Sequence, residues 1–589
     1  MANPGVLEDH DAAVLTASPN RETPAPAPVR APALLAATAL ASAALTACGG
    51  GGADGSSAPP PVAPEPVSDT QAARFLLHAQ FSASDSDIAA VRAQGYAAWL
   101  EQQFDAAPGS TGWDWLNANG YGAVDANKYY DSSAPGDYMI WNQLMTAPDA
   151  VRKRAALALS EFFVVSLTGI NFTWRGHGIA QYWDILVANA FGNHRKLLED
   201  VTLNAAMGNF LNTKGNKKEN ASGRQPDENY AREVLQLFSI GLYELNLDGT
   251  EKRDAQGNKL ETYTAADVSN LARVFTGYDF DQSQNVDTVV DGSRKVPNTA
   301  FTRLPMSLKE SDHSTLAATF LGTTIPAGTP GAQSLKIALD TLHKHPNVGP
   351  FLGRQMIQRL VTSNPSTAYV ARVASAFNNN GAGVRGDLRA MFRAILLDEE
   401  ARSAASLSQP LFGKLREPML RLVQWGRTFG LSSAAGSWKI GDLSNPATQL
   451  GQSPLRSPSV FNFFRPGYVP PSSALASAQS VAPEFQLVSE SSVGGYLNYM
   501  QNTIQKGISS DLKAAYASEL ALVTDAAALV GRLNLLLCAG QLSGATQTLI
   551  IDALNATPVT TTSTDAVKLN RVSAAVLLVM ASAEYLAQK

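Results

Sequence analysis

The amino-acid sequence predicts a mainly α protein: a large multi-helix globular body with a small β-hairpin insertion and long loops. The chain has 589 residues, of which 45% are apolar, and this is enough material for a large hydrophobic core. Past residue 70, apolar residues recur mostly at the spacing that is typical of amphipathic helices. No fixed-period repeat is visible, which argues against a repeat architecture.

The first 47 residues are interpreted as a signal peptide. Residues 31–47 form a short, alanine-rich apolar run that is too short to span a membrane. The run ends in Leu-Thr-Ala-Cys48, which resembles a bacterial lipobox, the sequence whose cysteine receives lipid. The alternative is an ordinary cleavage site followed by an unrelated cysteine. The order of apolar run, lipobox and linker favours lipidation of Cys48.

Residues 48–70 are rich in glycine, serine and proline, and they are predicted to form a flexible tether. Several acyl chains on Cys48 would anchor the protein stably to a membrane. We therefore expect an extracytoplasmic, membrane-anchored lipoprotein, on the periplasmic face or in the outer membrane. Gly49 resembles a residue that permits outer-membrane sorting in Gram-negative lipoproteins.

Residues 71–589 are predicted to form the helical body, with internal boundaries near the polar segments 281–300 and 430–452. Asp-Gly and Gln-Gly turns between short alternating runs predict the β-hairpin over residues 245–263. The clearest helical patterns cover residues 85–104, 147–166, 179–211 (two helices), 265–277, 346–366, 511–538 and 567–588.

Composition excludes several classes of function. The net charge is −5 and no run of lysine or arginine is present, so nucleic acid is not expected as a partner. Two cysteines, Cys48 and Cys538, argue against a disulfide scaffold and against a cysteine-based zinc site. No nucleophile elbow, Walker loop, dinucleotide fingerprint, His-Glu-x-x-His motif or EF-hand loop occurs. The sequence therefore identifies no metal, cofactor or reaction.

One short segment, residues 223–241, concentrates charge at the start of a predicted helix. Pro226 suits the first helical position, and acidic residues there complement the helix dipole. Glu228 and Arg232 are spaced to meet on the helix surface, and Glu233 lies farther round. Helix capping explains this pattern without chemistry. The alternative is a fixed guanidinium–carboxylate network in a polar site.

The same segment, "PDENYAREVLQLFSIGLYELNLDG", resembles the signature of the bacterial DUF1800 family. Further blocks resemble the family in the expected order, including "HPNVGPFLGRQMIQRLV" and "SPSVFNFFRPGYVPP", over roughly residues 70 to 588. The family has no assigned function, so the resemblance implies secretion but little chemistry. It also implies a frequent neighbour, a sulfatase-like protein of the DUF1501 family. His313, in an Asp-His pair that the family often has, is a candidate base, and helix capping by its neighbours is the alternative.

Charged residues inside otherwise apolar blocks are expected to be paired, because buried charges are rarely left alone. These residues form either one structural ion-pair network or the floor of a cleft for an anionic ligand. The aromatic segment "FNFFRPGY" is expected to pack in the core, and an aromatic ligand surface is the alternative. The proposed network comprises Glu228, Arg232, Glu233, Arg354, Arg359, Arg416 and Glu417.

Two functions follow as hypotheses. In the first, the chain is a scaffold or accessory partner of another secreted protein, such as a DUF1501-family protein. In the second, it is an extracytoplasmic hydrolase acting on an anionic or glycan substrate. The hydrolase would bring its catalytic candidates together in a deep pocket, whereas a scaffold would present a broad apolar patch. The catalytic candidates are Glu228, Arg232, Glu233 and His313.

Overall fold

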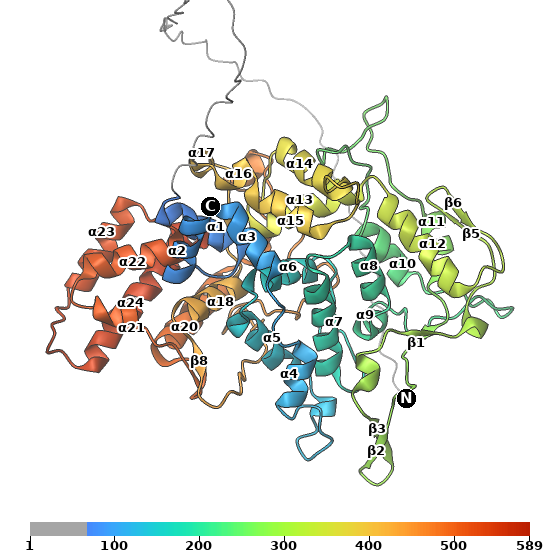
Figure 1. Ribbon diagram of the computed structural model, residues 1–589, viewed down its shortest axis with the longest axis horizontal. Coiled ribbons are helices and arrows are strands. Elements are labelled where there is room, and N and C mark those ends of the chain that lie inside the picture. Colours follow the sequence, from blue (N-terminus) through green and yellow to red (C-terminus); the bar gives the residue numbers. More distant parts are fainter. Residues whose placement is uncertain (1–66) are drawn as a thin grey trace, which may run out of the picture. The chain divides into compact units, whose positions relative to one another are not determined.

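The computed structural model describes residues 67–589, so the signal peptide, Cys48 and most of the predicted tether lie outside the described residues. The described residues belong to one compact unit (Figure 1). Within them, 25 α-helices and five two-stranded sheets confirm the mainly α prediction. Helix α1 (Asp69–Ala79) begins inside the segment predicted as tether, because Ser68 and Gln71 form a capping box there.

Two of the predicted N-terminal helices are divided. Residues 85–104 form α2 (Asp85–Gln94) and α3 (Tyr96–Asp105), because Gly95 adopts a φ of 78° that interrupts the helix. Residues 179–211 belong to three helices rather than two, since Asn193 and Asn204 each cap a new one. The other elements of this region are α4 (Gly112–Ala118), η1 (Tyr129–Asp131), α5 (Ala134–Thr146), α6 (Ala150–Ser160), α7 (Arg175–Asn189), α8 (His194–Thr202) and α9 (Ala205–Phe210).

Helix α10 (Asn229–Gln236) begins later than the sequence predicts. Pro226 does not occupy the first helical position, because the Asp227 carboxylate accepts a hydrogen bond from the Asn229 N–H at 2.8 Å and sets the start there. Helix α11 (Ala265–Val274) opens with the capping box that the sequence predicts, formed by Thr264 and Asp267.

The predicted hairpin over residues 245–263 is irregular. Isolated bridges join Leu245 to Glu251 and Arg253 to Lys259, and they fold the chain into two successive turns. A regular hairpin, β2 (Asp287–Val290) with β3 (Arg294–Pro297), lies inside the predicted polar loop 281–300. Its tip is the dipeptide Asp291-Gly292, and both residues have positive φ, as this type of turn requires.

The short elements on either side of this hairpin form two further small sheets. β1 pairs with β4, and β5 pairs with β6, each in antiparallel register. These elements are β1 (Tyr278–Asp279), η2 (Ala300–Thr302), β4 (Ser307–Leu308), η3 (Glu310–Asp312), β5 (Ala318–Phe320) and β6 (Thr323–Ile325).

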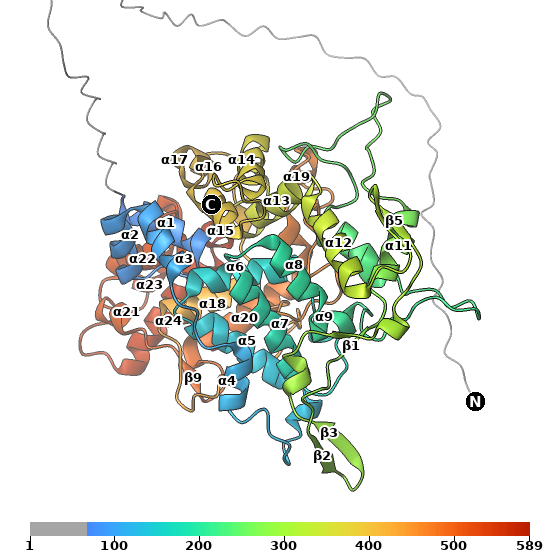
Figure 2. The ribbon, with the colours of Figure 1, turned by 45° about the vertical axis from the view of Figure 1, so that its right-hand side comes forward.

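The helix predicted over residues 346–366 is α13 (Val348–Leu360), and the next helix is capped by Ser366 as the sequence predicts. Helices α13, α14 and α15 pack against one another and lie side by side in both views (Figures 1 and 2). Helix α13 also packs on α6, which is buried along almost its whole length. The other helices here are α12 (Gly331–Lys344), α14 (Thr367–Asn378), α15 (Leu388–Leu397), α16 (Glu399–Arg402) and α17 (Ala404–Leu407).

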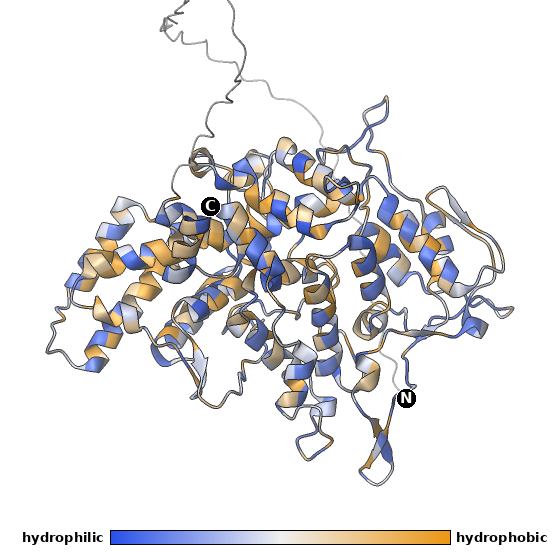
Figure 3. Ribbon diagram, viewed as in Figure 1, coloured by the Kyte–Doolittle hydropathy of each residue, from blue (hydrophilic) through white to orange (hydrophobic). Residues whose placement is uncertain are grey.

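The C-terminal region contains more helices than the two that were predicted. Helices α22 and α24 pack on each other and on α23, and these helices carry both hydrophobic and hydrophilic residues along their length (Figure 3). The elements are β7 (Lys414–Leu415), α18 (Pro418–Thr428), β8 (Ser432–Ser433), α19 (Ala474–Ser477), η4 (Pro483–Leu487), α20 (Glu490–Lys506), β9 (Leu512–Lys513), α21 (Ala517–Ala521), α22 (Ala526–Cys538), α23 (Gly544–Asn555), α24 (Asp565–Ala581), α25 (Ala583–Leu586) and β10 (Ala587–Gln588).

The end of the chain returns to its beginning. Strand β10 pairs with β7, and the Arg74 guanidinium on α1 donates to the backbone carbonyl of Lys589 at 3.2 Å. Cys538 is buried on α22, where burial raises its thiol pKa to about 12. Across residues 67–589, no helix combines the length and the apolar character that crossing a membrane requires.

Two glycines offer a matched test of packing at positive φ. Gly277 and Gly223 have φ of 89° and 90°, so alanine at either position carries a backbone cost of about 1 kcal/mol. A Cβ at Gly277 would lie 2.9 Å from the Lys309 carbonyl oxygen, whereas a Cβ at Gly223 would meet nothing within 4 Å. We expect Gly277→Ala to destabilise the protein by about 1–3 kcal/mol more than Gly223→Ala. Equal shifts of the thermal unfolding midpoint would contradict this prediction.

Candidate functional site

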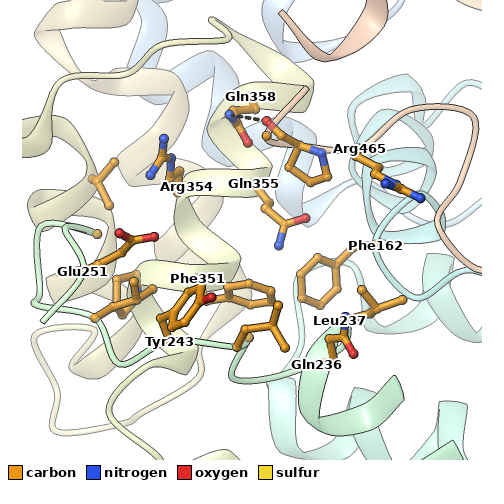
Figure 4. Close-up of a pocket in the computed structure, with 18 of the residues that line it drawn as sticks. Phe162, Gln236, Leu237, Tyr243, Glu251, Phe351, Arg354, Gln355, Gln358 and Arg465 are labelled. Atoms are coloured by element: carbon orange, nitrogen blue, oxygen red, sulfur yellow. Dashed lines mark hydrogen bonds between the residues drawn. The ribbon is translucent and has the colours of Figure 1, made fainter. Parts of the chain in front are cut away.

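A cavity of about 780 Å³ lies among segments that are far apart in the sequence (Figure 4). Its lining comes from the residues that follow α6, the C-terminal end of α10, the irregular loop 241–253, helix α13 and the loop 460–467. A space of this size accommodates a small molecule. The segments after α10, on α13 and in loop 460–467 are those singled out by their sequence blocks.

The loop after α10 is fixed to the start of α13 by one buried side chain. The Asn347 amide donates to the backbone carbonyls of Ile240 at 2.9 Å and Tyr243 at 2.8 Å, and its oxygen accepts from the Leu245 N–H at 2.9 Å. Gly241 has a φ of 74°, and a Cβ there would lie 2.7 Å from the Phe351 ring. The absence of a side chain therefore lets this turn pass directly over an aromatic ring of the cavity wall.

The opposite wall, loop 460–467, is held by the other end of α13. The Gln358 amide donates to the Pro466 carbonyl at 3.3 Å, the contact drawn in Figure 4, and to the Ser363 carbonyl at 3.0 Å. The Arg465 N–H donates to the Gln486 side chain at 3.0 Å. One rigid helix therefore positions both loops that enclose the cavity.

The floor of the cavity is largely apolar and aromatic. Figure 4 shows Phe162, Leu237, Tyr243 and Phe351 along one side of the space. Phe461, from loop 460–467, is 39% exposed and belongs to the same lining. Such a surface binds the apolar body of a ligand and excludes water from it.

Four arginines line the cavity, Arg253, Arg354, Arg359 and Arg465, and Figure 4 labels Arg354 and Arg465 at different places in its wall. Arg253 pairs with Glu251, and Arg359 pairs with Glu161. Within residues 67–589 neither Arg354 nor Arg465 forms an ion pair, and Arg465 lies over the Phe461 ring at 4.9 Å. Burial lowers the pKa of Arg354, and Glu251 opposes this shift. The Glu251 carboxylate is itself engaged by Lys259 at 2.8 Å. Since guanidinium groups stay charged in proteins, the cavity presents two cations that are available to an anion.

A cluster of buried charges lies behind the cavity wall. The Arg359 Nε lies 3.4 Å from the Glu161 Oε2, and its Nη2 donates to the Glu161 carbonyl at 2.8 Å. The Lys414 ammonium lies 2.9 Å from Glu484 and 3.5 Å from Glu417. It also donates to the Arg359 carbonyl, at 2.8 Å. The cluster consists of Arg154, Glu161, Arg359, Lys414, Glu417 and Glu484.

Glu161 and Arg359 are the residues of this cluster that also line the cavity, and Glu161 is its acidic member there. Both of its carboxylate oxygens are buried and have no hydrogen-bond donor within the described chain. Burial raises the pKa of Glu161 to about 8, with Glu417 adding to the rise and Arg359 opposing it. Glu161 is not among the site residues predicted from the sequence, because it stands in the apolar run "SEFFVVS". A charge embedded in such a run was the available signal.

The four catalytic candidates do not converge. Glu228 and Arg232 form an ion pair of 3.1 Å on the protein surface, and Ser269 on α11 donates to Glu228. Glu233 is buried, and burial raises its pKa while Arg232 opposes the rise. His313 is buried, with its Nδ1 at 2.9 Å from the Thr276 carbonyl. None of the four lines the cavity, to which α10 contributes only its C-terminal end.

The proposed ion-pair network is spread over separate places. Only Glu228 and Arg232 pair with each other. Arg359 and Glu417 belong to the buried cluster, with Glu161 and Lys414 as their partners. Arg416 is buried against the Tyr585 ring, and its guanidinium donates to Gln424. Arg354 lines the cavity instead.

Across the described part of the chain, no group of three or more His, Cys, Asp or Glu side chains is arranged to hold a metal ion. A family model described as "Protein of unknown function (DUF1800)" matches residues 74–587. Neither a curated protein nor a solved structure matches the chain.

The raised pKa of Glu161 predicts a pH-dependent stability. The folded protein keeps the proton up to about pH 8, whereas the unfolded chain releases it near the ordinary value of 4.5. Stability therefore falls as pH rises through this window, by up to about 1.4 kcal/mol per pH unit for one proton.

Glu161→Gln, which carries no titrating proton, should flatten this fall in chemical denaturation at pH 5, 6, 7 and 8. Glu484, whose pKa burial also raises, retains part of the slope. Asp291→Asn, at an exposed hairpin tip, is the control and should keep the wild-type slope. An unchanged slope in Glu161→Gln would contradict the prediction.

Proposed function

We propose that this chain, which belongs to the DUF1800 family, binds a small amphipathic anion in the cavity of about 780 Å³. We also propose that it does so outside the cytoplasm, anchored to a membrane by lipid. The ligand has an apolar body, which packs on the aromatic floor, and anionic groups, which Arg354 and Arg465 bind. The observation that carries the proposal is the presence of two arginines without ion-pair partners in the described chain above an aromatic surface.

Physical costs favour this assignment over a purely structural role for the cavity. Arg354 is surrounded by enough protein to lower its pKa, yet no carboxylate of the described chain pairs with it. The partly buried, unpaired guanidinium of Arg354 would be stabilised by an external anion, because a hydrogen bond to a charged group contributes about 1.5–3 kcal/mol to the binding free energy. A planar guanidinium also suits bidentate binding of a carboxylate, phosphate or sulfate group.

A second role, as an accessory partner of a DUF1501-family protein, is favoured by exposed apolar side chains near α20. Val493 and Leu497 lie one turn apart on this helix and are 49% and 36% exposed. Phe485 and Val488, just before the helix, are 38% and 45% exposed. Apolar side chains grouped on a surface are typical of protein contacts. This role is compatible with ligand binding, because these residues do not line the cavity.

The anion proposal is tested by binding of octanedioate, a chain with two carboxylates, measured by isothermal titration calorimetry against the neutral 1,8-octanediol. Wild-type protein should bind the dianion and not the diol. Arg354→Gln and Arg465→Gln should each weaken binding by about 10-fold or more, because each removes a charged hydrogen bond of about 1.5–3 kcal/mol.

Arg303→Gln is the matched control, since Arg303 is an exposed arginine that lies over the Trp113 ring at 4.7 Å and outside the cavity. Its affinity should equal that of the wild type. Equal binding of diol and dianion, or equal losses in Arg303→Gln and Arg354→Gln, would refute the proposal.

Lipid anchoring is tested at Cys48. Mass spectrometry of the mature protein should find Cys48 as the first residue and bearing acyl chains, and the protein should sediment with membranes. Cys48→Ser should move it to the soluble fraction, because the acyl chains supply the apolar area that binds the bilayer. An unmodified Cys48 in the mature wild-type protein would contradict the lipid anchor, whatever the ligand.

A further inference from the structure

Beside the large cavity lies a second, much smaller space. It measures about 10 Å³, roughly the room that one water molecule needs. Glu161 and Asn462 line both spaces and so separate them. The remaining polar lining comes from Ser160, Ser453 and Ser457.

The polar atoms around this small space are unusually poor in partners. Within residues 67–589, no hydrogen bond reaches either carboxylate oxygen of Glu161, the hydroxyls of Ser453 and Ser457, or the amide nitrogen of Asn462. Glu161, Ser453 and Ser457 are 6%, 0% and 4% exposed. Leaving each such group unsatisfied costs about 1–3 kcal/mol, so a cluster of them around one space points to a bound polar species.

The charges around Glu161 favour water over a cation in this space. The buried cluster holds three cationic side chains, Arg154, Arg359 and Lys414, and Arg359 lies 3.4 Å from Glu161. These cations balance the carboxylates of Glu161, Glu417 and Glu484, so the cluster has no excess negative charge to hold a metal ion, whereas a water molecule both donates to the carboxylate and accepts from the serine hydroxyls. Water in this position lies next to a carboxylate and at the border of a ligand cavity.

We infer that Glu161 is the catalytic base of a hydrolase, which uses water in the small space to cleave an ester of the amphipathic anion bound in the large cavity. This inference rests on the proposed function, because Arg354 and Arg465 must hold the anionic end of the substrate. It assigns catalysis to residues other than Glu228, Arg232, Glu233 and His313.

The reaction balances without a co-reactant. The Glu161 carboxylate takes a proton from water, and the water oxygen forms a bond to the ester carbonyl carbon. The negative charge that develops on the carbonyl oxygen is stabilised by the unpaired amide N–H of Asn462. The bond from this carbon to the alcohol oxygen then breaks, and the proton passes from Glu161 to the departing alcohol. The products are a carboxylic acid and an alcohol.

The pH dependence follows from the environment of Glu161. Burial and Glu417 raise its pKa to about 8, and Arg359, Arg154 and Lys414 oppose the shift. A base acts in its ionised form, so the turnover rate should rise with pH through about 8 and level off above it.

The test uses the mono-4-nitrophenyl ester of octanedioate, an ester with one free carboxylate, and the full-length protein. Wild type should release 4-nitrophenolate with saturation kinetics. Glu161→Gln should lower kcat by about 10²–10⁴-fold with little change in KM, as expected for loss of a general base. Glu233→Gln is the control, because Glu233 is another buried carboxyl with an unpaired oxygen but lies outside both spaces.

Ser457→Ala provides a second variant, since it removes a hydroxyl from the small space without changing charge. It should also lower kcat, which keeps the test decisive if Glu161→Gln does not fold. Wild type that binds octanedioate but does not hydrolyse the ester would overturn the inference and leave the proposed function intact. Equal kcat values for Glu161→Gln, Glu233→Gln and wild type would overturn it as well. Failure to bind octanedioate would instead overturn the proposed function.

Discussion

The centre of the protein depends on the ion pairs and the hydrogen bond that the buried ammonium group of Lys414 forms. This group lies between the carboxylates of Glu417 and Glu484 and also donates to the backbone carbonyl of Arg359 at 2.8 Å. These contacts join β7, the start of α18, η4 and α13. Removing one member of a buried pair leaves an uncompensated charge and costs about 3–5 kcal/mol, so the cluster fixes one relative position for the segments that it joins. The position of Glu161, at the end of α6, follows from the same cluster, because Arg359 binds both its backbone carbonyl and its carboxylate.

This arrangement separates rigid from adaptable parts of the site. Helix α13 is the rigid part, since it packs on α6, α14 and α15. Loop 241–253 is attached to it through Asn347 and loop 460–467 through Gln358, and Gln486 also holds the second loop. Of the residues proposed to contact the ligand, Arg465 and Phe461 therefore lie on a loop, and Arg354 and Phe351 lie on the helix. A cavity with one fixed and one loop-built wall can accept ligands whose apolar bodies differ while the anionic group stays in one place.

Several features that depend on neighbouring residues were predicted from the sequence, whereas features that depend on long-range contacts were not. The capping box at Thr264 and the cap at Ser366 depend on neighbouring residues, and both are present. The single helix predicted over residues 85–104 overlooked Gly95, whose positive φ divides it. The sequence left two interpretations open for the embedded arginines, and the structure contains both arrangements, since Arg359 is in a buried cluster and Arg354 lines a cavity. The apolar run around Glu161 marks it as an embedded charge, but its partners could not be identified from the sequence, because Arg359 and Glu417 approach it only through tertiary packing.

The charges of the cluster also connect ligand binding to protonation. With Glu161 ionised, three carboxylates balance three cations, Arg154, Arg359 and Lys414. Protonation of Glu161 leaves a net positive charge behind a cavity whose wall already carries Arg354 and Arg465, and this favours an anion. By linkage, a bound anion favours the proton on Glu161 to the same extent. In the proposed hydrolysis the bound substrate is itself an anion and already favours the proton on Glu161, and the acid product, which carries one more carboxylate, favours it further. On this proposal, release of the acid lowers the proton affinity of Glu161 and so favours its ionised form.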